Sequence, residues 1–211
     1  MFSDDRRMTT MTTIFSIGHG NRTLDDFVNL LKQYEIKYLI DIRSKPYSRF
    51  SPHFSKPALE QTLPQYDIRY VYMGDLLGGF PDNPECYTPD GRVDYAKLKL
   101  EPSYQTGIAR LKRASEQNLQ VAVMCSELKP QHCHRSKLIG ESLAETNIPM
   151  LHIDEAGGTK NHTQVINEVK AELLRVPPAQ MSLFGDDQEF SLTSRKRHDS
   201  GRATSDSPDE N

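Results

Sequence analysis

The segment MCSELKPQHCHRSKL, residues 124–138, holds the residues with the most varied chemistry in the chain. Cys125 ends an apolar run that predicts a strand, and Cys133 begins a run with the pattern of a helix. A cysteine at a helix N-terminus beside cationic side chains has a lowered pKa and is a candidate nucleophile. Both cysteines are therefore candidate catalytic residues, although Cys125 can equally be a small buried core residue.

The same segment offers Cys125, His132, Cys133 and His134 as metal ligands. The cysteines do not have C-x-x-C spacing, and three of the four residues are consecutive, so their side chains are not expected to converge on one ion. We therefore predict no metal and no other cofactor.

Further polar residues follow other predicted strands. His19 ends the apolar run 13–19, and Asp41 lies within the run 38–44. Ligands of open α/β sheets bind at the carboxyl ends of the strands, so these side chains are expected at one edge. The candidate acid–base residues there are His19, Asp41, Glu127 and His134. Asp41 can alternatively hold an arginine in place.

Basic and aromatic residues are expected near the same edge. Arg43, Arg49 and Arg135 form a candidate phosphate or anion site, although each can also be a solvated side chain. Aromatic residues interleave with the basic residues over 43–54, a pattern that suits single-stranded or distorted nucleic acid. Phe50 and Phe54 can instead pack in the core.

Strand-like and helix-like runs alternate along the chain. The alternation predicts an α/β protein with a three-layer, mostly parallel Rossmann-like sheet and helices on both faces. We expect a flexible leader over 1–12, a single domain over 13–176 and a disordered tail over 177–211. Residues 74–102 are rich in glycine and proline and predict a long loop.

The tail contains an apolar cluster, QMSLF at 180–184. Gln180, Met181, Leu183 and Phe184 resemble the short peptide by which bacterial DNA polymerases and repair proteins bind the sliding clamp. Leu183 and Phe184 would fill an apolar pocket of the clamp, and a flexible linker would let the peptide reach it. Alternatively, the cluster packs back on the domain.

Four segments together resemble the domain of unknown function 488 family. They are SIGHG at 16–20, DIRSKPYSRF at 41–50, LGG at 77–79 and MCSELKPQHCHR at 124–135. The family's first motif usually ends in serine, where this chain has Gly20. The resemblance covers 14–175 and implies an α/β domain whose polar edge contains His19, Asp41, Arg43, Cys125, Glu127, Cys133, His134 and Arg135. It implies no established reaction.

Composition narrows the function classes. The formal net charge is −3, and the residues from Asp186 onward carry all of it. The rest of the chain is therefore neutral overall and has no basic excess that would indicate nucleic-acid binding. The chain has three cysteines, no secretory segment and no membrane-spanning run, which predicts a cytoplasmic protein without structural disulfides.

Together these features predict an enzyme acting on DNA or a nucleotide in repair or replication, recruited by the sliding clamp through QMSLF. The alternatives are a non-catalytic module that binds nucleic acid or a nucleotide, and a cysteine-dependent small-molecule enzyme.

Overall fold

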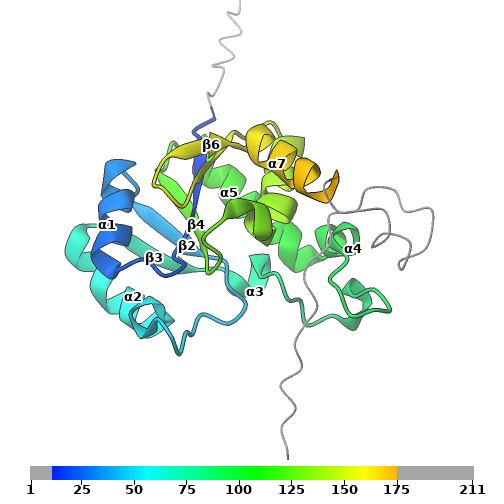
Figure 1. Cartoon of the computed structure of the whole chain (residues 1–211), viewed down its shortest axis with the longest axis horizontal. Coiled ribbons are helices and arrows are strands. Elements are labelled where there is room, and N and C mark those ends of the chain that lie inside the picture. Colours follow the sequence, from blue (N-terminus) through cyan, green and yellow to red (C-terminus); the bar gives the residue numbers. More distant parts are fainter. Residues whose placement is uncertain (1–10, 175–211) are drawn as a thin grey trace, which may run out of the picture.

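The computed structural model describes residues 11–174 and confirms the α/β prediction (Figure 1). Six strands form one sheet in the order β3-β2-β4-β1-β5-β6. All neighbours are parallel except β5 and β6. The strands are β1 Ile14–Gly18, β2 Tyr38–Asp41, β3 Arg69–Tyr72, β4 Val121–Cys125, β5 Met150–Ile153 and β6 Thr159–Asn161.

Helices cover both faces of the sheet. The α-helices are α1 Leu24–Gln33, α2 Lys56–Thr62, α3 Gly74–Leu77, α4 Tyr95–Leu100, α5 Pro102–Glu116, α6 Glu141–Glu145 and α7 His162–Leu174. The 3-10 helices are η1 Pro52–Phe54, η2 Leu63–Tyr66, η3 Pro84–Cys86 and η4 Pro130–His132, and the π-helix is η5 Arg135–Gly140.

The sheet lies between two layers of helices, and one apolar cluster joins each helical layer to the sheet. One cluster packs α1 and α2 on one face of the sheet, and the other packs α3, α4, α5 and α6 on the opposite face. The central strand β4 serves both, because successive side chains of a strand point to opposite faces. Val123 and Cys125 face the α5 side, whereas Ala122 and Met124 face the α1 side. This alternation places Cys125 on the side of α5 and α6.

The segment expected as a long loop is partly helical. Within 74–102 the chain forms α3, η3 and α4, so the prediction of a continuous loop was wrong. Each of these helices is six residues or shorter and is separated by glycines and prolines, which hides its period in the sequence. Tyr95 and Leu98 of α4 are buried in the cluster around α5.

The two ends of the chain lie largely outside the described residues. Met11 and Thr12, part of the expected leader, contact the domain: the Thr12 backbone N–H donates to the Ser115 carbonyl at 3.2 Å. QMSLF and the predicted tail, like residues 1–10, fall outside the described range. Within residues 11–174, none of the helices has the length and apolar character needed to cross a bilayer.

Candidate active site at the carboxyl edge of the sheet

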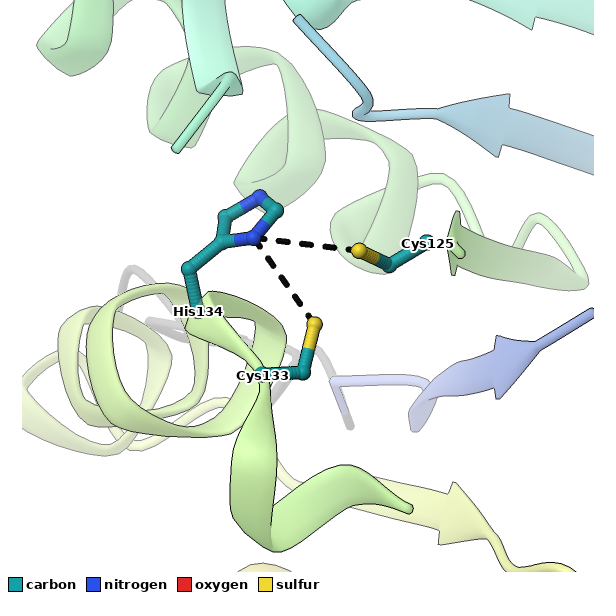
Figure 2. Close-up of side chains that lie close together, drawn as sticks. All are labelled: Cys125, Cys133 and His134. Atoms are coloured by element: carbon teal, nitrogen blue, oxygen red, sulfur yellow. Dashed lines mark hydrogen bonds between the residues drawn. The ribbon is translucent and has the colours of Figure 1, made fainter. Parts of the chain in front are cut away.

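Two cysteines and a histidine converge beyond the end of β4. Cys125 is the last residue of that strand, and Cys133 and His134 lie between η4 and η5. The Nδ1 atom of His134 lies 3.8 Å from the Cys125 Sγ and 3.7 Å from the Cys133 Sγ (Figure 2). Both thiols are nearly buried, with 7% and 3% of their surfaces exposed. We call these three residues the cysteine–histidine cluster.

The local backbone explains why consecutive residues converge. Cys133 is extended, with φ −123° and ψ 149°, whereas His134 is helical, with φ −62° and ψ −20°. The change in conformation brings both side chains toward Cys125. The sequence argument that consecutive side chains would not converge therefore does not hold for this pair.

Backbone N–H groups and charge support negative sulfur in the cluster. The Arg135 N–H donates to the Cys133 Sγ at 3.4 Å, and the Glu127 N–H bonds to Cys125. The hydrogen bond from the Cys133 thiol holds the pKa of Cys125 well below its usual range despite burial, and His134 lowers it further. Burial and the Cys125 sulfur raise the pKa of Cys133 well above its usual range. Within the pair, Cys125 therefore gives up its proton more readily than Cys133.

A pocket of about 230 Å³ opens beside the cluster. Its lining combines the ends of β2 and β4 with the segments around Gly79, Tyr95 and His132. The lining residues are Arg43, Ser44, Lys45, Gly79, Phe80, Tyr95, Cys125, Ser126, Glu127, His132, Cys133 and His134. Of these, Glu127 is an acidic, solvent-exposed residue. The pocket lies where open α/β sheets bind ligands.

Arg43 is fixed by a buried carboxylate. Its Nε donates to Asp41 Oδ1 at 2.9 Å, its Nη2 donates to Asp41 Oδ2 at 2.6 Å, and the Tyr70 hydroxyl donates to the same carboxylate at 2.6 Å. The Nη2 also donates to the Phe54 carbonyl at 2.7 Å. Burial alone would lower the pKa of Arg43, but the bonds to Asp41 raise it. Asp41 therefore holds the arginine in place, which was the alternative role considered for it.

His19 supports Arg43 from the other side. Its Nδ1 bonds to the Gly20 carbonyl at 3.0 Å, its Nε2 lies 3.3 Å from Arg43 Nη1, and its ring stacks on Phe54 at 4.5 Å. Burial, and then the charge of Arg43, lower the pKa of His19 to about 4. A neutral ring with Nδ1–H donating to Gly20 accepts from Arg43 through Nε2. Both nitrogens are thus used in positioning, and His19 does not line the pocket.

The three predicted arginines do not meet on the pocket wall. Arg43 lines the pocket, whereas Arg49 is exposed on the following loop. Arg135 is wholly buried behind the cluster, where its Nη2 donates to the Leu128 carbonyl at 2.8 Å. Its Nε and Nη1 have no hydrogen-bond partner among the described residues. Arg135 therefore supplies positive charge behind the sulfur atoms and does not offer a surface contact for an anion.

Gly18 is required by close packing at this point. A Cβ on Gly18 would lie 1.9 Å from the Glu127 carbonyl oxygen and 2.7 Å from Arg135 Nη1. The loop after β4 thus lies directly against the end of β1. The absence of a side chain at Gly18, the first glycine of SIGHG, lets the segment carrying Glu127 approach the sheet.

Sequence reasoning missed several pocket residues, which come from the supposed loop. Tyr95 and Phe80 gave no signal that distinguishes them from other aromatic residues. Gly79 did give a signal, because paired glycines permit close approach. A Cβ on Gly79 would lie 3.1 Å from His134 Nδ1. Gly79 therefore leaves room for the imidazole of the cluster.

A separate series of hydrogen-bonded side chains runs through the neighbouring part of the core. The Ser16 Oγ lies 2.7 Å from His152 Nδ1, the His152 Nε2 lies 3.2 Å from His162 Nδ1, and the His162 Nε2 lies 2.8 Å from Glu141 Oε1. Burial, and then the charges of Arg135 and His162, lower the pKa of His152 well below its usual range. Ser16 and His152 are completely buried, so this series of side chains holds β1, β5, α6 and α7 together.

The fold and the pocket thus define an α/β protein with a polar site at the carboxyl edge of its sheet. The chain belongs to the family described as domain of unknown function DUF488, whose model matches residues 23–143. The match includes the DIRSKPYSRF and MCSELKPQHCHR segments and begins after SIGHG. Comparison with curated proteins and with solved structures gives no match.

Proposed function

We propose that this protein is an enzyme that acts on DNA or a nucleotide in repair or replication, with the pocket as its active site. The observation that carries the proposal is the position of the cysteine–histidine cluster beside an exposed aromatic and cationic loop. This loop, residues 44–51, is called the aromatic loop, and its Ser44 and Lys45 line the pocket.

The aromatic loop presents side chains suited to bases and phosphates. Phe50 and Tyr47 have 98% and 70% of their surfaces exposed, and the neighbouring Lys45 and Arg49 are exposed as well. Aromatic rings stack on bases, with about 1–3 kcal/mol per base, and neighbouring cations follow the phosphate backbone. Exposed rings beside cations therefore favour a single-stranded or locally opened substrate.

The dimensions of the site favour one base or nucleotide in the pocket. Its volume of about 230 Å³ is smaller than a drug-sized cleft. A neighbouring hollow of about 470 Å³ shares Ser44, Lys45 and Phe80 with it but is also lined by Asp75, Asp82 and Glu101. These carboxylates repel phosphate, so the sugar–phosphate backbone of the nucleic acid is expected to follow Lys45 and Arg49. An enzyme of this kind takes its target base out of the stack.

Recruitment by the sliding clamp through QMSLF is part of the same proposal. The peptide lies outside the described residues, and its support is the order Gln180, Met181, Leu183 and Phe184. Binding to a bacterial sliding clamp should be lost in the double variant Leu183→Ala/Phe184→Ala. The matched control is Phe190→Ala/Leu192→Ala, which removes the same two residue types from the same tail. Equal binding by both variants would remove the clamp from the proposal.

The test of the active site is binding of a labelled single-stranded oligonucleotide, measured by fluorescence anisotropy at several salt concentrations. Lys45→Ala/Arg49→Ala should weaken binding and reduce the slope of log K against log salt by about 1.4, because each phosphate contact contributes roughly 0.7. Arg110→Ala/Arg113→Ala on α5 removes the same charge from exposed positions and should leave the slope unchanged. The proposal fails if the two double variants behave alike.

A further inference from the structure

We propose that Cys125, Cys133 and His134 bind a zinc ion whose fourth coordination position opens into the pocket. The two sulfurs and one ring nitrogen of these residues all lie within 4.8 Å of one another. Figure 2 shows the three side chains pointing toward a common centre from two segments of the chain. Binding of the metal does not depend on the proposed nucleic-acid function.

The distances fit tetrahedral zinc. Bond lengths of about 2.3 Å to sulfur and about 2.0 Å to nitrogen, at tetrahedral angles, place sulfur and nitrogen roughly 3.5 Å apart. The observed separations from His134 Nδ1 are 3.8 Å to Cys125 and 3.7 Å to Cys133. A shift of a few tenths of an ångström therefore brings both nitrogen–sulfur separations to this value. Thiolate and imidazole ligands select zinc over magnesium or calcium, which prefer oxygen.

The surroundings stabilise the deprotonated ligands that a metal requires. Each sulfur receives a backbone N–H, from Glu127 to Cys125 and from Arg135 to Cys133. The buried guanidinium of Arg135 adds positive charge behind the site, and its Nε and Nη1 have no hydrogen-bond partner within residues 11–174. Hydrogen bonds to ligating atoms orient them and tune the metal.

Three protein ligands and a pocket indicate a catalytic rather than a structural metal. Structural zinc sites are closed by four protein ligands, whereas catalytic sites keep one position for water or substrate. In the described part of the chain, no fourth histidine, cysteine or carboxylate joins the group. His132 lines the pocket, but its Nε2 bonds to Glu172 at 3.1 Å. The remaining position therefore belongs to water or substrate.

The chemistry that follows is hydrolysis with water as the only co-reactant. Zinc lowers the pKa of bound water to about 7. Glu127, two residues after Cys125 and on the pocket wall, accepts the proton of that water. The hydroxide forms a bond to an electrophilic carbon, the bond from that carbon to its leaving group breaks, and the leaving group takes the proton from Glu127. Zinc deaminases of nucleobases combine two cysteines, a histidine and a non-ligating glutamate in this way; the choice of a base amine as leaving group rests on the proposed function.

The test uses the full chain, treated with a chelator and titrated with Co²⁺ and then Zn²⁺ in the absence of nucleic acid. We expect the absorption bands of tetrahedral cobalt thiolate, saturation at one ion per chain, and displacement by zinc. His134→Gln and Cys133→Ser should weaken zinc binding by more than about 100-fold, beyond the loss caused by removing an outer hydrogen-bond partner. Cys86→Ser, which changes the third free buried cysteine, should retain the bands.

Folding of each variant is checked by circular dichroism. If the ligand variants do not fold, the melting temperature of the unaltered protein decides: it should rise with Zn²⁺ and not with Mg²⁺. A protein without cobalt bands and without a zinc-dependent rise, or one whose Cys125 and Cys133 are joined as a disulfide under reducing purification, would overturn the zinc site. Oligonucleotide binding is a separate measurement, so its absence would contradict the proposed function and leave the metal result standing.

Discussion

Replacement of Asp41 by asparagine should be among the most destabilising single changes in this protein. Asp41 is completely buried and accepts hydrogen bonds from the Arg43 side chain, the Arg43 backbone and the Tyr70 hydroxyl. Asparagine has a similar shape but no charge, and its NH₂ group cannot accept from the guanidinium. The variant therefore leaves a buried cation without its counter-ion.

The size of the expected loss of stability depends on the burial of the ion pair and not on its N···O distance. Removing one partner of a buried ion pair costs about 3–5 kcal/mol. For a chain of this size that lowers the melting temperature by roughly 6–20 °C, at about 2–4 °C per kcal/mol. The matched control is the exposed pair Lys99–Glu145, which has the same N···O distance of 2.6 Å. Glu145→Gln should cost about 1 kcal/mol or less, because water already solvates both groups.

The assay is urea denaturation of Asp41→Asn, Arg43→Met and the double variant. In the double variant neither charge remains, so its loss of stability should be clearly smaller than the sum of the two single losses. Equal costs for Asp41→Asn and Glu145→Gln would refute the reasoning. Additive single costs would also refute it, because Asp41 and Arg43 would then not act as a unit.

The remaining predictions concern packing, pH and the exposed loop. Gly18→Ala should cost about 1–3 kcal/mol in urea denaturation, because its Cβ would overlap the Glu127 carbonyl oxygen and displace that loop; an unchanged midpoint would contradict the close approach. Because His152 stays neutral when folded but takes a proton when unfolded, the free energy of unfolding should fall as pH drops below about 6.5, and His152 alone should contribute up to roughly 1.4 kcal/mol per pH unit to this slope. His152→Asn should reduce this slope and leave the share due to His19, whose folded pKa is also lowered; an identical slope would argue against the assignment. Phe50→Ala should change stability by no more than about 0.5 kcal/mol, since the ring is 98% exposed, yet weaken oligonucleotide binding; unchanged anisotropy curves would show that no base stacks there.

The sequence predicted the parts of the site that follow the strands. Asp41 and Cys125 are the last residues of β2 and β4, and the parallel pairing of these strands brings their carboxyl ends together. Thr23 accepts a hydrogen bond from the Asp26 N–H at 3.1 Å and so caps the start of α1, as threonine before an amphipathic run commonly does. These features depend on local pattern and on the general rule for parallel sheets, and both can be read from a sequence.

Other features depend on tertiary packing and leave little trace in the sequence. Arg135 follows Cys133 closely, and its charge suggested a surface position, but the π-helix η5 turns it into the core. Tyr95 reaches the pocket because α4 packs against α5, an arrangement that the composition of 74–102 conceals. Likewise, convergence of Cys133 and His134 needs a change of backbone conformation between neighbouring residues, which periodicity does not encode.

The most direct test of the central claim is hydrogen–deuterium exchange with and without a single-stranded oligonucleotide. We predict that added protection is concentrated in the aromatic loop and in residues 125–135, which border one pocket. Protection confined to α1, which packs on the opposite face of the sheet from the cysteine–histidine cluster, or to the edge strand β6 would contradict the placement of the active site.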